Sequence, residues 1–133
     1  MPTSEPHLNN IVDPVRKKSV ANTPEEAVRQ ATIRFLHSNR GIPTGLMKVE
    51  QVIENAPGDK RADLIIYSTT GKPWMLVECK APSIKIDQTT FDQIANYNRF
   101  VKAPYLFVTN GSDHFCMEVV DGLVTFIDDL PIW

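Results

Sequence analysis

Three charged residues lie in two short apolar segments that are close together in the chain. Asp63 lies in segment 61–68, and Glu78 and Lys80 lie at the end of segment 74–80. Two carboxylates supply oxygen ligands that a hard cation such as Mg²⁺ prefers, together with water and phosphate oxygens. An ammonium group beside them can orient a nucleophilic water or stabilise charge that develops on a phosphoryl oxygen. These residue types suit metal-assisted hydrolysis of a phosphodiester.

The two segments are predicted to form neighbouring antiparallel strands, because only the turn-rich residues 69–73 separate them. Alternation along each strand separates an apolar face from a charged face. The apolar face is predicted to hold Ala62, Leu64, Ile66, Met75, Val77 and Cys79. The other face then brings Asp63 together with Glu78 and Lys80 at one end of the hairpin, with Arg61 beside them. The competing interpretation is an ordinary charge cluster on a solvated sheet face.

Helical and strand patterns in the rest of the chain would position this hairpin. Thr23 and Glu26 have the spacing of a capping box, and Gly41 follows the helical pattern that they begin. Two helices are predicted, at 23–39 and 87–102. Strands are predicted at 46–53, 61–68, 74–80, 105–109, 114–120 and 123–127. This order predicts an α/β sandwich with a mixed central sheet of about five strands, flanked by helices.

The composition is that of one globular domain. The chain has 133 residues, of which 42% are hydrophobic and 23% are charged. Residues 1–14 contain three of the ten prolines and are predicted to be an extended arm, so the domain is expected to span 15–133. No segment approaches the length of a membrane span and no secretory signal is visible, which predicts a cytoplasmic protein without a membrane partner.

Charge, cysteine and histidine usage narrow the function further. A net charge of −2 argues against a protein that coats nucleic acid through its whole surface. Cys79 and Cys116 are too few for a disulfide framework, and both are predicted to be buried hydrophobes. The three histidines are scattered, which argues against a zinc site. They are His7, His37 and His114.

The hairpin residues resemble the core motif of the PD-(D/E)xK nucleases. That resemblance is carried by the runs Lys60-Arg61-Ala62-Asp63-Leu64-Ile65-Ile66 and Leu76-Val77-Glu78-Cys79-Lys80-Ala81-Pro82. The sequence is most similar to the N-terminal nuclease domain of type I restriction enzyme R subunits, with a RecB-like arrangement. Gln93 and Tyr97 match the Gln-x-x-x-Tyr motif of those nucleases, and 24–30 resembles their opening helix. The similarity spans about 15–115.

This resemblance implies a restriction-endonuclease-like fold and a Mg²⁺-dependent DNA endonuclease, with Mn²⁺ as a substitute ion. It implies that Asp63, Glu78 and Lys80 are catalytic. Metal ligands would be Asp63, Glu78 and the backbone carbonyl of Cys79. A glutamate of the first helix would also reach the metal; Glu26 is preferred, and Glu25 is the alternative. Gln93 and Tyr97 would contact DNA, while Glu50 and Arg61 would have supporting roles.

The implied partners are DNA and, since the chain has no Gly-x-x-x-x-Gly-Lys-Ser/Thr phosphate loop, a separate helicase, translocase or other restriction-modification subunit. Self-association of the chain stays open. A second function is a non-catalytic DNA-binding or assembly module of a restriction-modification or DNA-processing complex. The presence of both carboxylates, the lysine and the helix glutamine favours the enzyme.

Overall fold

The computed structural model describes residues 10–58 and 60–133, which form an α/β fold around a mixed sheet of six strands. The helices are α2 (Pro24–Arg40) and α3 (Gln88–Val101), with a short 3-10 turn at Thr44–Leu46. The sheet strands, in spatial order, are β3 (Met47–Val52), β4 (Arg61–Tyr67), β5 (Pro73–Cys79), β6 (Tyr105–Thr109), β7 (His114–Val120) and β8 (Leu123–Ile127). Only the β5–β6 pair is parallel, and α3 connects its two strands.

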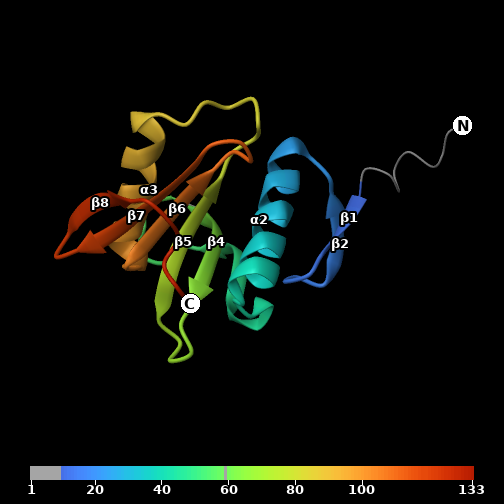
Figure 1. The fold of residues 1–133 in the computed structure, drawn as a ribbon, viewed down its shortest axis with the longest axis horizontal. Helices are drawn as coiled ribbons and strands as arrows, with labels where there is room; N and C mark the ends of the chain where they lie inside the picture. Colours follow the sequence, from blue (N-terminus) through green and yellow to red (C-terminus); the bar gives the residue numbers. More distant parts are fainter. Residues whose placement is uncertain (1–9, 59) are drawn as a thin grey trace, which may run out of the picture.

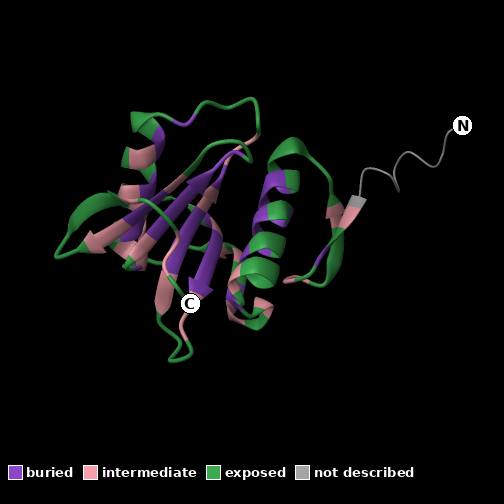
Figure 2. Ribbon diagram, in the orientation of Figure 1, coloured by how far each residue is buried: buried purple, intermediate pink, exposed green. Residues whose placement is uncertain are grey.

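The two helices cover opposite faces of the sheet (Figure 1). On the α2 side, Ile33 and Leu36 are fully buried against a core cluster that includes Leu64 and Val77. On the α3 side, Ile94 packs into a second cluster with residues from β4, β5, β6 and β7. The middle strands are therefore buried on both faces (Figure 2).

The predicted elements agree closely with the observed ones. Both helices and all six strands fall within one or two residues of their predicted bounds. The sheet has six strands where about five were predicted, because 123–127 pairs along its full length with β7, from Val120↔Leu123 to Cys116↔Ile127. Both cysteines are buried and free, as expected, and burial raises the pKa of each thiol.

Ala62 does not share the face predicted for it. It packs in the α3-side cluster with Ile65, whereas Leu64 and Ile66 pack on the α2 side. The alternation changes beside Glu50, which has a left-handed φ of 52° and interrupts the β3–β4 pairing at Asp63. A positive φ is uncommon outside glycine, so the sequence did not signal this distortion.

The start of the described chain forms a two-stranded antiparallel hairpin of β1 (Asn10–Asp13) and β2 (Lys18–Ala21). This corrects the prediction of an extended arm over 1–14 for residues 10–13; residues 1–9, including His7, lie outside the described part. The buried Asp13 carboxylate accepts the backbone N–H groups of Val15 and Arg16, which stabilises the turn. Figure 1 shows the hairpin on the outer side of α2, away from the sheet.

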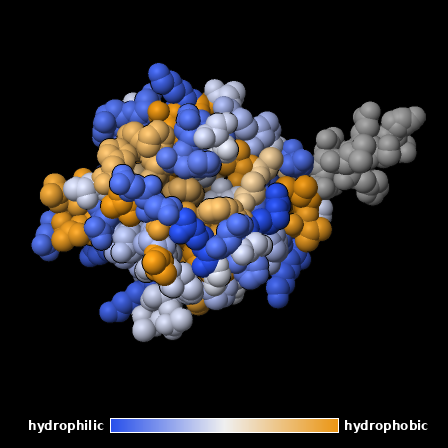
Figure 3. All heavy atoms as spheres, viewed as in Figure 1, coloured by the Kyte–Doolittle hydropathy of each residue, from blue (hydrophilic) through white to orange (hydrophobic). Residues whose placement is uncertain are grey.

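Apolar side chains are also exposed where β7 and β8 meet, at the left end of the molecule in Figure 3. Val120, Leu123 and Phe126 are each more than half exposed there. Among the described residues, neither α2 nor α3 combines the length and hydrophobicity that a helix needs to cross a bilayer.

Candidate active site

The candidate site lies where β4 and β5 separate. Their backbone pairing runs from Ile66↔Met75 to Leu64↔Val77. At the next position the Cys79 N–H donates to the Asp63 carboxylate over 2.8 Å. A side chain thus takes the place that a backbone carbonyl would hold in a continued ladder, and Asp63 is fixed between the two strands.

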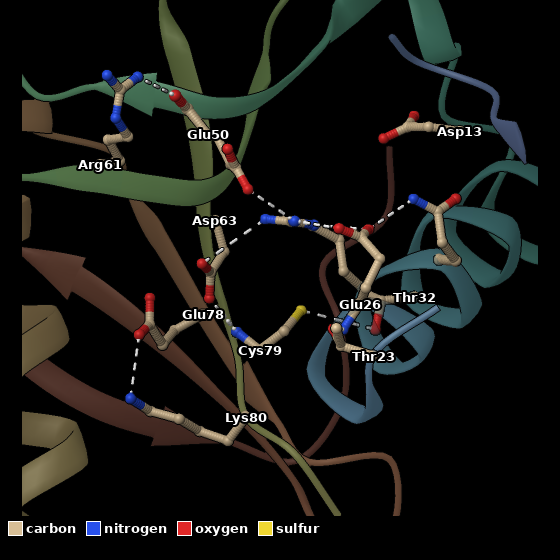
Figure 4. A network of polar contacts seen from close by, with 12 residues as sticks. Asp13, Thr23, Glu26, Thr32, Glu50, Arg61, Asp63, Glu78, Cys79 and Lys80 are labelled. Atoms are coloured by element: carbon tan, nitrogen blue, oxygen red, sulfur yellow. Dashed lines mark hydrogen bonds and ion pairs between the residues drawn. The ribbon is translucent and has the colours of Figure 1, made fainter. Parts of the chain in front are cut away.

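Glu78 and Lys80 complete a compact group with Asp63 (Figure 4). Lys80 Nζ lies 3.3 Å from Glu78 Oε2, and Asp63 is close enough for its charge to raise the pKa of Glu78. The Lys80 backbone is held separately, because its N–H donates to the Thr109 carbonyl over 2.9 Å. The structure therefore brings together the three residues predicted from the hairpin.

The two carboxyl groups are not fully neutralised by cations. Burial, followed by the charge of Asp63, raises the pKa of Glu78 to about 8, and Lys80 offsets this only partly. Burial also raises the pKa of Asp63. Two acids this close share a proton readily, since ionising both in a partly buried site is unfavourable. Lys80 alone does not neutralise both carboxyl groups, so binding of a further cation beside them would be favourable.

Glu25, in the first turn of α2, interacts electrostatically with Asp63 and Lys80. Its pKa is raised, first by loss of hydration and then by the charge of Asp63, while Lys80 acts in the opposite direction. Its side chain is exposed at the start of α2. Glu25 is therefore available to a ligand bound at Asp63 and Glu78.

Glu26, the glutamate preferred from the sequence, is bound by other side chains of the protein. Its backbone N–H donates to Thr23 Oγ1, so half of the predicted capping box forms. Its carboxylate accepts hydrogen bonds from Arg16, Arg29 and Gln30 instead of returning to the cap. Despite burial, these bonds lower the pKa of Glu26. The carboxylate of Glu26 is thus engaged by Arg16, Arg29 and Gln30, whereas no such hydrogen bonds hold the Glu25 carboxylate within the described residues.

Arg29 connects this helix to the site. Its guanidinium pairs with Glu26, lies 2.9 Å from Glu50 Oε1 and lies 3.8 Å from Asp63 Oδ1. Arg29 is buried, and its acidic neighbours raise its pKa further against the effect of burial. The sequence analysis missed Arg29, although Glu26, Arg29 and Gln30 at i, i+3 and i+4 place three polar groups on one helix face.

The remaining predicted residues lie around this centre. Glu50 is about half exposed and pairs with Arg29, while its backbone carbonyl accepts from Arg61 over 3.3 Å. On α3, Gln93 is exposed and Tyr97 is half buried in the α3-side core, with Lys60 Nζ 6.0 Å from its ring centroid. Within the described residues, neither α3 side chain bonds to Asp63, Glu78 or Lys80.

The donor set fits a hard divalent cation with few protein ligands. No group of three or more His, Cys, Asp or Glu side chains gathers as a metal cluster anywhere in 10–58 and 60–133. Mg²⁺ is commonly held by one or two carboxylates, with waters and substrate oxygens completing its shell. The under-neutralised pair at Asp63 and Glu78 has that composition.

A cavity of about 340 Å³ lies elsewhere, between α2 and β6–β7, and has a mostly apolar lining. It is bordered by Val28, Phe35, Phe107 and His114, among others, and by none of Asp63, Glu78 and Lys80. The charged group thus lies outside this cavity.

The chain matches the family model described as the type I restriction enzyme R protein N terminus, over residues 24–131. The match includes both helices, all six strands of the sheet and the candidate site, and it begins after the β1–β2 hairpin. No curated protein matches the chain.

Proposed function

The chain belongs to the family of type I restriction enzyme R protein N termini, and on that basis we propose that it is a divalent-metal-dependent DNA endonuclease domain of a restriction system. The observation that carries the proposal is the meeting of Asp63, Glu78 and Lys80 where β4 and β5 separate. Two carboxylates and one ammonium in a partly buried group are the components of metal-assisted phosphodiester hydrolysis.

The proposal includes a restriction-endonuclease-like fold with a PD-(D/E)xK motif. Its support is the mixed six-stranded sheet between two helices, with the acidic residues at the end of a central hairpin. The run Glu78-Cys79-Lys80 at the end of β5, with Asp63 on the neighbouring β4, is the arrangement that such a motif requires.

A Mg²⁺ ion, or Mn²⁺ in its place, would be held by Asp63, Glu78 and the Cys79 backbone carbonyl, with Glu25 available from α2. When bound, the ion supplies polarisation of the scissile phosphate and a more acidic water. Glu78 must release the proton that its raised pKa retains before it acts as a ligand. Ion binding is therefore coupled to proton release in the neutral pH range.

Lys80 and the α3 residues have roles toward the substrate in this proposal. The Lys80 ammonium orients the attacking water or stabilises charge that develops on the phosphoryl oxygens. Gln93 and Tyr97, one helical turn apart, contact a DNA phosphate or sugar. Exposure of Gln93 on α3 leaves its amide free to donate such a bond.

The net charge of −2 gives the domain little general attraction for DNA. We propose that other subunits or domains of a restriction-modification complex, including a translocase, deliver DNA to the site. The support for this context is that the family is described as the N terminus of the type I restriction enzyme R protein.

The proposed activity is tested with supercoiled plasmid and the purified chain, in Mg²⁺, in Mn²⁺ and in EDTA. We expect nicked or linear DNA only with the metal ions. Lys80→Ala should abolish the product, and Lys72→Ala, in the turn at the opposite end of the same hairpin, should not. Wild-type protein that binds Mn²⁺ and DNA without cutting would replace the endonuclease with the non-catalytic module.

A further inference from the structure

A continuous chain of ion pairs runs from the β1–β2 hairpin to Asp63. Arg16 Nε lies 2.6 Å from Asp13 Oδ2, and Arg16 Nη2 lies 3.2 Å from Glu26 Oε1. Glu26 in turn binds Arg29, whose Nη1 lies 3.8 Å from Asp63 Oδ1. The ion pairs connect the hairpin, α2 and β4, in addition to the apolar core that α2 and β4 share and against which Val15 packs.

From this chain we infer that Arg29 is the positioning residue that holds the Asp63 carboxylate against the Cys79 N–H, and that Arg16 braces Arg29 from the hairpin. The inference rests on the proposed function for its meaning, because Asp63 is the proposed metal ligand. Its geometry, however, concerns only residues of this chain and can be measured without metal or DNA.

The shape of the guanidinium explains why arginine suits this position. One edge of Arg29 is fixed by Glu26, through Nε at 3.0 Å and through Nη2, and Nη2 also binds Glu50 at 2.9 Å. The remaining nitrogen, Nη1, is left facing Asp63. A planar guanidinium can contact three carboxylates at once, whereas a lysine ammonium is a single point charge.

Burial makes the arrangement rigid. Arg29 and Glu26 are only 6% and 7% exposed, and Asp13 is fully buried. Side chains buried with all their charges paired cannot move one at a time without leaving a charge uncompensated. Asp63 therefore has one cation at a fixed position on its α2 side, and the Cys79 N–H on its β5 side.

The hairpin contributes through Arg16, although it lies before the residues that the family model matches. Arg16 is about one-fifth exposed, and it bonds both Asp13 and Glu26. It closes the outer side of Glu26, which would otherwise face solvent. In the absence of Arg16, Glu26 has more freedom and Arg29 loses part of its anchorage.

Amide hydrogen exchange of the intact chain, measured by NMR, tests the inference at Cys79. Its N–H is protected by Asp63, whereas the adjacent Lys80 N–H is bonded to Thr109 and serves as an internal control. Arg29→Gln should accelerate exchange at Cys79 about tenfold or more and leave Lys80 unchanged, as expected for loss of one hydrogen bond. Arg40→Gln, which removes an exposed ion pair on the same helix, should change neither.

Two further variants keep the test decisive if Arg29→Gln folds poorly. Arg29→Lys retains the charge, and we expect exchange at Cys79 to rise nearly as much as with glutamine. Arg16→Gln removes only the brace, and we expect a rise of about threefold, because the Arg29–Asp63 contact remains.

Wild-type exchange at Cys79 in Arg29→Lys would overturn the positioning role, since charge alone would then suffice. Equal acceleration at Cys79 and Lys80 would also overturn it, because that result describes general loosening. Exchange is read without metal or substrate, so an inactive wild type would count against the proposed function and leave this inference standing. In an active protein, Arg29→Lys should lower kcat and leave KM nearly unchanged.

Discussion

The molecule contains two clusters of buried carboxyl groups, one at Asp13 and Glu26 and the other at Asp63 and Glu78. Their negative charges are balanced in opposite ways. In the α2–hairpin cluster, Asp13 accepts hydrogen bonds from Arg16 and the backbone N–H of Val15, and Glu26 accepts from Arg16, Arg29 and Gln30. These partners lower the pKa of both carboxyls despite burial. In the site cluster, burial raises the pKa of both Asp63 and Glu78, and the charge of Asp63 raises the pKa of Glu78 further. Lys80 beside Glu78 and Arg29 beside Asp63 offset only part of this effect.

The difference is the one expected between charge that holds the fold together and charge that would bind a ligand in the proposed function. Fully paired charges hold elements together and have no need of a ligand, whereas an under-neutralised acidic pair gains from binding a cation. Strongly perturbed titrating groups tend to gather at functional sites for this reason. The comparison can be tested from both sides.

The largest expected effect is the loss of stability in Glu26→Ala. Removing this carboxylate leaves the buried Arg29 and the partly exposed Arg16 with Glu50 alone as a shared partner. Breaking a buried ion pair from one side typically costs about 3–5 kcal/mol in the free energy of unfolding, which urea titration measures. Asp129→Ala, which removes an exposed partner of Arg40 at the other end of α2, should leave the unfolding midpoint almost unchanged. A comparable loss in both variants would contradict the distinction between the clusters.

Lys80→Ala should show the reverse pattern, with function lost and stability kept. Loss of one electrostatic stabiliser of a transition state lowers the rate by about 10²–10³. The pair of Lys80 with Glu78 is partly exposed, so its removal should change the unfolding free energy by only ~0–1 kcal/mol. Plasmid cleavage and calorimetric titration with Mn²⁺ measure the two properties. Unchanged cleavage would remove Lys80 from the proposed mechanism.

The clusters should also respond to pH in opposite directions. Glu78 has a folded-state pKa of about 8, above its usual 4.5, so the folded protein binds this proton more tightly than the unfolded chain does. The resulting stability is present below about pH 4.5 and is lost as the pH rises through 8. In EDTA, Glu78→Gln should remove this decline, and at pH 8.5 it should be more stable than wild type by on the order of 2 kcal/mol.

For Glu26 and Asp13 the sign is reversed. Their pKa values are lowered by folding, so their contribution is present at neutral pH and is lost as the pH falls below the usual carboxyl range. Urea titrations of wild type and Glu78→Gln across pH 3–9 separate the two trends. Parallel curves for the two proteins above pH 5 would show that Glu78 titrates normally.

The smallest effect is expected for Gln93→Ala. Loss of one neutral hydrogen bond to DNA should weaken cleavage by about tenfold or less. Mn²⁺ affinity should stay at the wild-type value, because Gln93 does not contact Asp63 or Glu78 within the described residues. Calorimetry with Mn²⁺ and cleavage kinetics measure both, and Asn96→Ala, on the same exposed helix, is the control. Loss of Mn²⁺ binding in Gln93→Ala would make Gln93 part of the metal site.

The sequence predicted the site cluster well, because that cluster depends on local rules. A short turn and two alternating strands are enough to bring Asp63 close to Glu78 and Lys80. The distances between these groups followed from strand pairing, which is among the most regular features of a chain.

The paired cluster was missed because it depends on long-range packing. The same Thr23-x-x-Glu26 pattern predicts a capping box whichever way the glutamate side chain turns, and the burial of Arg29 becomes visible only once the hairpin covers α2. The left-handed φ at Glu50 could not be predicted from the sequence either, since glutamate does not favour that conformation. Buried charge networks join segments that sequence patterns treat separately.

The single parallel pair in the sheet implies an order of assembly. Strands β3, β4 and β5 are consecutive and antiparallel, so their contacts close short loops. The β5–β6 pair, in which Val77 aligns with Phe107, forms only after α3 has crossed the sheet. Longer loops cost more entropy to close, and non-local strand pairing slows folding. The β4–β5 hairpin, which contains Asp63 and Glu78, is therefore expected to form first. The strands beyond the parallel β5–β6 pair are expected to add to it later.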